Sequence, residues 1–582
     1  MTPTMAGNCP FPFFRRCQIF KKHAIRSFGD LKKQIITSHN LWNLFSQRSL
    51  VFGYPTGLII YLLYNRNQNF MFKNFSLLFY CFFIPHLLFS QVLPGEGSNL
   101  NYRLIGFSFP EMKKTNNYKV EIASGSYYNE ESFKKNIIKS INSKTNKIIG
   151  EVPSFGKNYT WRIVYTEEKG ASKGSKFYHF KTGMSPNVDT NINRLRIIKS
   201  TGKNNGSYIF LDGNKVLYDM NGHPVWYLPD IDSFVNENCI PRDIKLTQQG
   251  TITLLVHEKA YEISYNGDIL WKVPNKSQSN TESQEPYHHE FTRLGNGHYM
   301  VLGMESGMFR LNSKGADRNP GNPVTPQLKD SAATVVQQHF RFGKILEFDN
   351  EGNVIWSYKT SQYFMGQEII NRRNSGETIN INPHDNSFYF DEQSSVIYIS
   401  FRDINRIIKI KYPEGKVLAD YGEQYNSGVQ EAGSGLFCKQ HCVRHSANGY
   451  LYLFNNNNCN LGRAPKIVIL QEPVTDTEIL KKIWEYECST EDISKDELLD
   501  NTSSGGGSVE ELPDKSFFTC MGVPYGKVFI VNRDKAILWS AVPEKWNQDE
   551  KKWKIIPQYR ASIITDSKQL EHLVMNEEIE KR

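Results

Sequence analysis

The stretch KILEFDNEGNVIW, residues 344–356, decides the fold of this 582-residue chain. Its apolar and polar residues alternate on both sides of a glycine-containing turn, and the second half ends on Trp356. Such alternation around a turn predicts two antiparallel strands joined as a hairpin. The same pattern ends on tryptophan in four other stretches: LYDMNGHPVW (217–226), YEISYNGDILW (261–271), ILQEPVTDTEILKKIW (469–484) and FIVNRDKAILW (529–539).

A sixth stretch, IIKIKYPEGKVLADYG (407–422), has the same hairpin with Ala419 where tryptophan would stand. Short strands of even length that recur every few dozen residues are typical of a β-propeller, so we expect an all-β fold with six blades. The repeated tryptophans are expected to pack between the blades.

The start of each unit carries polar or charged residues at one repeated position. Arg242, His289 and His441 each stand eight residues before a turn glycine, so internal alignment makes them equivalent. The first strand of each blade lines the central channel of a propeller. The sequence therefore predicts a polar ring in that channel, suited to binding an anion.

The net charge of +9 does not indicate a nucleic-acid partner. Residues 1–90 carry ten Lys and Arg against one acidic residue, so the rest of the chain holds 59 of each sign. A neutral body has no general basic surface to attract a polyanion.

An internal methionine begins an apparent export signal, MFKNFSLLFYCFFIPHLLFSQ, from Met71 to Gln91. A basic start, a short apolar run and a small residue before the cleavage point are the features of a signal peptide. We expect translation to start at Met71, residues 1–70 to be an upstream extension, 71–90 to be the signal peptide, and the protein to be periplasmic or secreted. The rival interpretation is two membrane segments, but both apolar runs are shorter than the ~20 residues that span a bilayer.

The rest of the chain divides into three parts. Residues 91–183 alternate apolar and polar residues in short strands and predict a small fibronectin- or immunoglobulin-like β-sandwich, for packing, spacing or dimerisation. Residues 190–564 are the expected propeller and catalytic domain. Residues 565–582 form an acidic tail, expected either to cap the last blade or to lack order.

Six cysteines follow the expected signal peptide, an even number that fits an oxidising compartment. We expect one disulfide beside His441, with Cys438, Cys442 and Cys459 as the candidates and the pairing open. The spacing of Cys438 and Cys442 has no second pair suited to zinc, so no metal site is predicted there.

Four short motifs occur in order along the repeats: HHE (288–290), HDNS (384–387), SFR (400–402) and QH (440–441). In this order, on six repeats behind a small sandwich domain and a signal peptide, they resemble the bacterial arylsulfate sulfotransferases. The resemblance covers roughly residues 98–564.

The resemblance implies that His441 is a nucleophile that takes the sulfuryl group of an aryl sulfate and passes it to a phenol. It implies that His289 or its neighbour His288, together with His384, Asn386 and Arg402, binds the sulfuryl oxygens and assists proton transfer. A loose alignment adds Ser508 as a substrate-binding residue.

These residue types suit the chemistry. Donors such as Arg402, His384 and Asn386 stabilise negative charge that spreads over three sulfuryl oxygens, and an imidazole nucleophile predicts ping-pong kinetics without a cofactor. The partners would be a small aryl sulfate donor and a phenolic acceptor, with no nucleic acid, no membrane span after signal cleavage, and a homodimer as one option.

Two other functions fit the same repeats. One is a secreted, non-catalytic propeller that binds a sulfated or anionic ligand, since one fold serves many functions. The other is a lyase or hydrolase in which His289, His384 and His441 hold a divalent metal. Arg402 argues against the metal because it would repel a cation.

Overall fold

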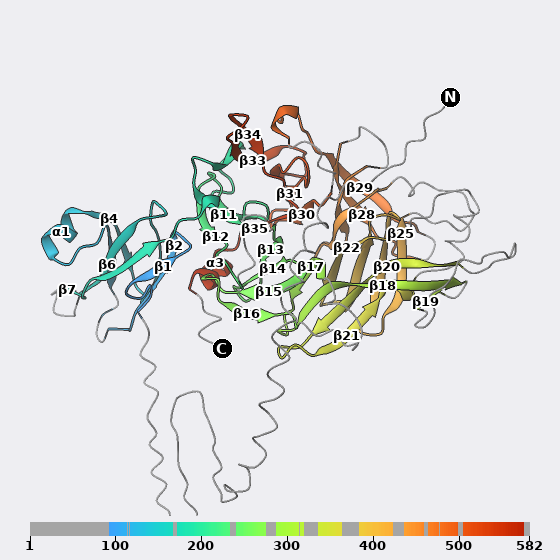
Figure 1. Ribbon diagram of the computed structural model, residues 1–582, viewed down its shortest axis with the longest axis horizontal. Helices are drawn as coiled ribbons and strands as arrows, with labels where there is room; N and C mark the ends of the chain where they lie inside the picture. The colour runs from blue at the N-terminus through green and yellow to red at the C-terminus, as the bar shows by residue number, and fades with distance from the viewer. Residues whose placement is uncertain are drawn as a thin grey trace, which may run out of the picture. The chain divides into compact units, whose positions relative to one another are not determined.

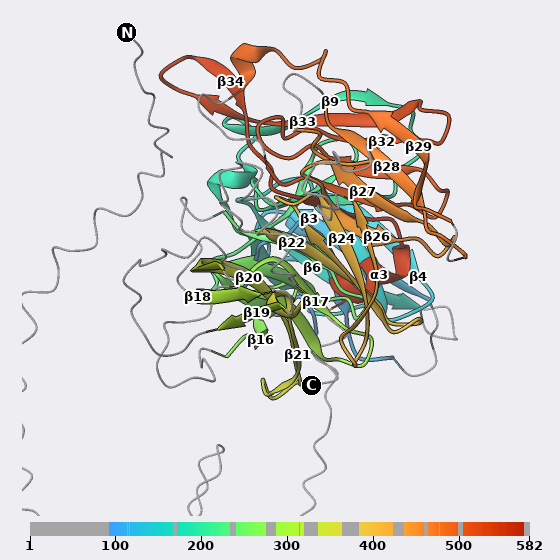
Figure 2. The same cartoon turned by 90° about the vertical axis from the view of Figure 1, so that its right-hand side faces the viewer.

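The computed structural model shows an all-β protein (Figures 1 and 2). The expected extension (1–70) and signal peptide (71–90) lie outside the described residues. The structure describes residues 92–575 except 113–114, 116, 167–171, 233–239, 275–286, 313–314, 319–335, 364–382, 423–435, 459–463, 476–477 and 499–504. No helix in this described part is long and apolar enough to cross a membrane.

Two sheets form the N-terminal part of the described chain. Their apolar faces meet around Phe107 and Trp161, whose ring centroids are 4.9 Å apart. Helix α1, Glu130–Lys135, begins at an Asn129 cap. The larger sheet has the order β1 (Ser98–Leu100), β8 (Tyr178–Thr182), β6 (Asn158–Thr166), β3 (Tyr118–Ser124), β4 (Ile137–Ser143), with β7 (Ser172–Gly174) on β6, and the smaller pairs β2 (Leu104–Ser108) with β5 (Lys147–Glu151).

Six further sheets follow, numbered here as sheets 1 to 6 in chain order. Sheet 1 contains β10 (Tyr208–Leu211), β11 (Val216–Asp219), β12 (Pro224–Tyr227) and β35 (Ala561–Ile564); sheet 2 contains β13 (Arg242–Leu246), β14 (Ile252–Val256), β15 (Lys259–Ile263) and β16 (Ile269–Lys272); sheet 3 contains β17 (Tyr287–Arg293), β18 (Tyr299–Asn312), β20 (Val336–Phe348) and β21 (Val354–Lys359), with β19 (Gly315–Arg318) on β18.

Sheet 4 contains β22 (Asp385–Asp391), β23 (Val396–Phe401), β24 (Arg406–Lys411) and β25 (Lys416–Gly422); sheet 5 contains β26 (His441–His445), β27 (Leu451–Asn455), β28 (Lys466–Gln471) and β29 (Lys481–Glu487); sheet 6 contains β30 (Ser508–Glu511), β31 (Phe517–Cys520), β32 (Val528–Val531), β33 (Ile537–Asn547) and β34 (Lys552–Ile555), with β9 (Asn193–Ser200) on β33. Short 3-10 helices span Pro186–Val188, Thr360–Gln362 and Lys495–Glu497.

Each repeat recognised in the sequence lies within one sheet, with its tryptophan on an outer strand. The indole N–H groups then join neighbouring sheets. Trp226 Nε1 donates to Tyr265 O at 2.7 Å, Trp356 Nε1 to Pro413 O at 2.7 Å, Trp484 Nε1 to Arg533 O at 2.9 Å, and Trp539 Nε1 to Met220 O at 2.8 Å. Each acceptor lies beside a turn of the following sheet, and for Trp539 that sheet is sheet 1.

Sheet 1 combines the two ends of the repeat region. Strand β35 pairs antiparallel with β10, so its residues at 561–564 take the inner position of a sheet that begins at 208. The inner strands contact one another from sheet to sheet, including β30 with β35 and β35 with β13.

The C-terminal tail contains a helix, α3 (Ser567–Val574), which contacts β2 and β35. Its buried Leu573 and Val574 pack in the same apolar cluster as the N-terminal sheets and sheets 1 and 2. Residues 576–582 of the tail lie outside the described residues, so both alternatives predicted for the tail stay predictions.

Candidate active site

The inner strands that carry the predicted histidines are irregular at their starts. Pairing shifts register there in β17, β22 and β26. His289 has φ 65°, His384 has φ 56° and Cys442 has φ 53°, values that side chains with a Cβ adopt infrequently. Bulges turn a side chain out of the regular alternation, and backbone strain of this kind concentrates at functional sites. The irregularities aim His289, His384 and His441 into one region.

His289, rather than His288, contacts the other predicted residues. Its ring centroid lies 5.4 Å from that of His384 and 5.7 Å from that of Tyr559. His288 lies behind it, with its Nδ1 2.5 Å from His289 Nδ1. One of the two rings must donate the proton of this bond and the other must accept it, so the pair fixes the orientation of His289.

His384 and Arg402 share one carboxylate. His384 Nδ1 lies 3.4 Å from Asp403 Oδ2, and Arg402 donates to Asp403 Oδ1 at 2.7 Å. Lys439 Nζ lies 3.2 Å from the same carboxylate. Burial acts to raise the pKa of Asp403, but the hydrogen bond from His384 and the charges of His384, Lys439 and Arg402 hold it below its usual value. An ionised Asp403 therefore anchors three cationic or donor groups beside His441.

His441 is buried, and two groups fix its ring through Nδ1. Nδ1 lies 3.3 Å from Lys439 O and 2.7 Å from Asn456 Nδ2. Asn456 Nδ2 also lies 3.0 Å from Lys439 O and 3.1 Å from Gly506 O, and it donates to both. Two tautomers of His441 fit these contacts: with the proton on Nε2, Nδ1 accepts from Asn456 Nδ2, and with the proton on Nδ1, it donates to Lys439 O and leaves a lone pair on Nε2. Attack through Nε2 requires the second tautomer.

Three histidines of the site are held in the neutral form. Burial lowers the pKa of His441 well below its ordinary value, and the charges of Arg402, Arg560 and His384 lower it further. Burial and the neighbouring His288, His384, Arg242 and His441 do the same for His289. Burial, His384 and Arg242 lower the pKa of His288 to about 3. Neutral imidazoles can act as nucleophile or base near neutral pH.

Asn386 is fully buried and contacts the segment that carries His441. Its Nδ2 donates to Gln440 O at 2.6 Å, and its Oδ1 has no partner in the described part of the chain. Gln440 in turn donates through Nε2 to Ser400 Oγ, Phe401 O and Arg406 O at 3.0–3.1 Å. These bonds fix the backbone directly before His441.

Ser508 is engaged in a bond that joins two sheets. Its hydroxyl donates to Ala561 O at 2.9 Å and accepts from Ala561 N at 3.2 Å. Equivalent bonds run from Phe291 N to Asp243 Oδ2 at 2.9 Å and from Val443 N to Ser387 Oγ at 3.3 Å. Within the described residues, the Ser508 hydroxyl bonds to Ala561 and not to the histidines.

The bond pattern identifies a residue that sequence reasoning missed. Ala561 matches Phe291 and Val443, so Tyr559, two residues earlier, matches His289 and His441. Its ring centroid lies 6.4 Å from that of His441, and Arg242 stacks on the ring at 4.8 Å. The hydroxyl is shielded and has no partner among the described residues.

The sequence did not reveal Tyr559 because β35 is the last strand of the repeat region and no turn glycine follows it. Without that glycine, Tyr559 could not be aligned with His289 and His441. Asn456, which was also missed, lies in the run Asn455–Asn458 after β27. Its position after a strand gave no sign of its contact with His441.

The structure leaves fewer candidates for the disulfide expected beside His441. Cys442, next to His441, is a buried free thiol, as are Cys488 and Cys520. Cys442 is therefore excluded from the expected disulfide, because its side chain turns away and donates to Val509 O at 3.6 Å. Cys459 lies outside the described residues, so the pairing of Cys438 stays a prediction.

The arrangement combines the neutral imidazole of His441 with cations from three sheets. Arg242, Arg402 and Lys439 give the region positive charge, which favours a bound anion. The described residues contain no group of three His, Cys, Asp or Glu side chains placed to hold a metal ion. Attack by His441 Nε2 on an electrophilic centre that carries an anionic group fits this set of residues.

Comparisons with known proteins support this chemistry in one part of the chain. Residues 329–475 match the family described as Arylsulfotransferase (ASST). The matched segment contains His384, Asn386, Arg402 and His441, whereas His288, His289 and Ser508 lie outside it. No curated protein matches the chain.

Among solved structures, a protein of unknown function from Bacteroides caccae matches at 10% identity and a TM-score of 0.34, over 64% of this chain and 100% of that one. The dihydro-heme d1 dehydrogenase NirN matches at 10% identity and a TM-score of 0.28, over 83% and 81%. AztD from Citrobacter koseri matches at 8% identity and a TM-score of 0.27, over 77% and 98%.

Proposed function

Because residues 329–475 identify this chain as a member of the arylsulfotransferase family, we propose that it transfers a sulfuryl group from an aryl sulfate to a phenol without a nucleotide donor. The observation that carries the proposal is the meeting of His289, His384 and Arg402 around a neutral, oriented His441 (Figure 2 for β17, β22 and β26).

In the first half-reaction, His441 Nε2 attacks sulfur as the bond from sulfur to the aryl oxygen breaks. The products are an aryl oxide and a sulfohistidine, in which the imidazolium carries the sulfonate. Arg402 and His384 donate to the sulfuryl oxygens, whose negative charge they stabilise. Asn386 holds the backbone before His441 through Gln440 O.

In the second half-reaction, neutral His289 takes the proton of the acceptor phenol. The phenol oxygen then attacks sulfur, the bond from sulfur to Nε2 breaks, and His441 returns to its starting form. The lowered pKa of His289 keeps its imidazole neutral and free to take a proton, and the protonated form gives that proton up readily afterwards. Donors with acidic phenol leaving groups should therefore react fastest.

The fold interpretation belongs to the same proposal. We interpret sheets 1 to 6 as the blades of a six-bladed propeller, closed by β35 in sheet 1, and the two N-terminal sheets as the β-sandwich expected from the sequence. The tryptophan bonds from sheets 1, 3, 5 and 6 to the sheet that follows, including Trp539 to Met220, support this interpretation. Export by the signal at 71–90 and a periplasmic or secreted location complete it.

Steady-state kinetics test the reaction. Purified protein is supplied with 4-nitrophenyl sulfate and a series of phenol concentrations, and nitrophenolate release is followed at each. Parallel double-reciprocal lines and a sulfated phenol product support the proposal. Intersecting lines would contradict a covalent intermediate, and no release from folded protein would favour the ligand-binding alternative.

The variant Arg402→Lys tests the role of this one side chain in the same assay. Lysine keeps the charge near His441 but replaces a planar fork with a point charge, so kcat should fall about 10-fold or more. Lys409→Arg, at the outer contact with Glu472, is a matched control that should keep the wild-type rate. A normal rate in Arg402→Lys would remove Arg402 from the site.

A further inference from the structure

Arg560 occupies the centre of a buried ionic network beneath the histidines. Its Nη1 donates to Asp243 Oδ1 at 2.8 Å and to Glu290 Oε2 at 2.7 Å, and its Nη2 donates to Asn386 O at 3.1 Å. The Arg560 side chain is 3% exposed, and those of Asp243 and Glu290 are 5% and 4% exposed. One guanidinium therefore joins the inner strands of sheets 2, 3 and 4.

Each acceptor is next to a candidate site residue in the chain. Asp243 follows Arg242, and Glu290 follows His289. Asn386 lies two residues after His384, and its own side chain fixes Gln440, directly before His441. A bond that holds Asp243 or Glu290 also holds the backbone from which its neighbour, Arg242 or His289, projects.

Two further cations, Lys245 and Arg444, pair with the carboxylates of this network. Lys245 Nζ lies 2.7 Å from Asp243 and 2.9 Å from Glu290, and Arg444 Nη2 lies 2.9 Å from Glu290. Nearby Glu510 has its pKa raised to about 7 by burial, against the opposing charges of Arg444 and Lys245. Three cations thus face two fully paired carboxylates and a third that titrates near neutral pH.

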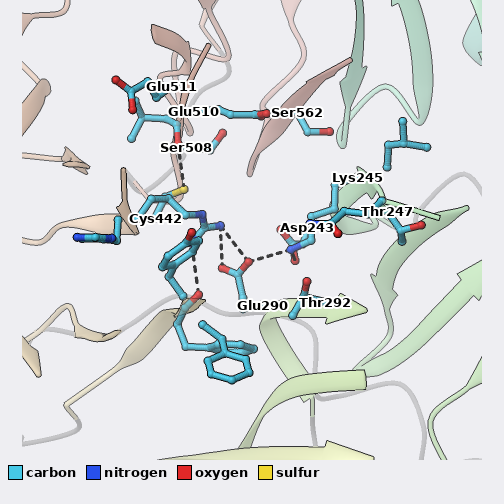
Figure 3. A pocket seen from close by; sticks show the side chains of 18 of the residues that line it. Asp243, Lys245, Thr247, Glu290, Thr292, Cys442, Ser508, Glu510, Glu511 and Ser562 are labelled. Atoms are coloured by element: carbon cyan, nitrogen blue, oxygen red, sulfur yellow. Dashed lines mark hydrogen bonds and ion pairs between the residues drawn. The ribbon is translucent and has the colours of Figure 1, made fainter. Parts of the chain in front are cut away.

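A cavity of about 760 Å³ lies on one side of this network. Asp243, Glu290 and Arg560 line it, while none of the histidines at 288, 289, 384 and 441 does. Figure 3 shows Glu290 between Lys245 and Asp243 on one side and Cys442 on the other, with Glu510 and Ser562 across the cavity. The Arg560 network therefore lies between the histidines and this cavity.

We propose that Arg560 is the positioning residue that sets the relative geometry of His289, His384 and His441. This inference rests on the proposed sulfuryl transfer for its kinetic test. Arginine is required because its planar fork reaches two carboxylates and a carbonyl oxygen at once, which an ammonium group cannot do in the same geometry.

Arg560→Lys is the variant that tests this role. Arg162→Lys is the matched control, because Arg162 is also buried and pairs with two carboxylates, Glu121 at 2.8 Å and Glu130 at 2.5 Å, in the N-terminal sheets. Both variants should lower the melting temperature. Arg560→Lys should lower kcat about 10-fold or more with KM within threefold, while Arg162→Lys should keep both constants.

A second measurement separates this inference from the proposed function. Diethyl pyrocarbonate modifies neutral imidazoles, and mass spectrometry of peptides gives a rate for each histidine. Arg560→Lys should change the rates at His289 and His441 at least threefold, with those at His223 and His257 unchanged. This readout holds even if the wild-type protein turns over no aryl sulfate, which would overturn the sulfotransferase proposal alone.

Folded Arg560→Lys protein with wild-type kcat and unchanged histidine rates would overturn the positioning role. If Arg560→Lys does not fold, Glu290→Gln replaces it, because the amide keeps the shape of the carboxylate but lacks its charge. Glu290→Gln should then change the His289 rate at least threefold, and an unchanged rate would equally overturn the proposal.

Discussion

Replacing Asn456 with alanine removes the side chain that lies against His441 Nδ1 while leaving the nucleophilic nitrogen in place. Asn456 is 3% exposed, and its Nδ2 donates to Lys439 O and Gly506 O. Each buried hydrogen bond contributes about 1 kcal/mol net, so the free energy of unfolding should fall by about 2 kcal/mol.

The effect on activity follows from the orientation of the imidazole ring. Without Asn456, the His441 ring loses a contact at Nδ1 and can rotate, which moves Nε2 away from the direction of attack on sulfur. A tenfold loss of kcat/KM corresponds to about 1.4 kcal/mol, the size expected for one orienting contact in a buried site. We therefore expect Asn456→Ala to lose about 10-fold in kcat/KM, mainly in kcat.

The assay compares Asn456→Ala with Asn101→Ala. Asn101 is buried in the N-terminal part and donates through Nδ2 to Tyr227 O at 2.9 Å and Tyr265 O at 3.3 Å, so it loses the same kind of bonds. Chemical denaturation should show similar destabilisation, and nitrophenolate release should fall in the Asn456 variant alone. If both variants keep wild-type kcat/KM, Asn456 does not orient His441.

Three further predictions concern stability. Trp539→Phe loses the hydrogen bond to Met220 O and should lower the free energy of unfolding by about 2 kcal/mol. Trp546→Phe, at a partly exposed position of β33, is the control and should lower it by less than half as much. Denaturant titration measures both. Ser508→Ala should cost about 1–2 kcal/mol because Ala561 N loses its acceptor, with kcat/KM within twofold; a tenfold loss would restore a substrate-binding role for Ser508. The pKa of His288 is about 3 in the folded protein, so below about pH 6.5 the unfolded chain binds more protons than the folded chain does. The melting temperature should therefore fall as the pH drops from 6.5 toward 3. His288→Gln should reduce this dependence of the melting temperature on pH, and an unchanged dependence would contradict the prediction.

The repeats could be predicted because the two strands of each repeated hairpin are close together in the sequence. The hairpin 344–356 and its relatives gave the strands, and the tryptophans marked the outer strands that carry Trp226 and Trp539. Internal register likewise brought His289 and His441 to equivalent positions, and the structure places them around Tyr559.

Contacts between distant segments could not be predicted in this way. Arg560 and Glu290 are 270 residues apart, and nothing in either local pattern indicates the pairing. The positive φ of His384 is a conformation that few non-glycine residues adopt, and no local pattern in the sequence marks this histidine as one of them. The free thiol of Cys442 depends on a bulge that turns its side chain away from Cys438, and spacing alone cannot reveal a bulge.

The most direct test of the account is the mass of the protein after brief exposure to 4-nitrophenyl sulfate without an acceptor. The account predicts a gain of one SO₃ group on His441, stable in alkali, lost on adding phenol, and absent from His441→Asn protein that remains folded. An adduct on another residue, or full turnover by the His441→Asn variant, would contradict it.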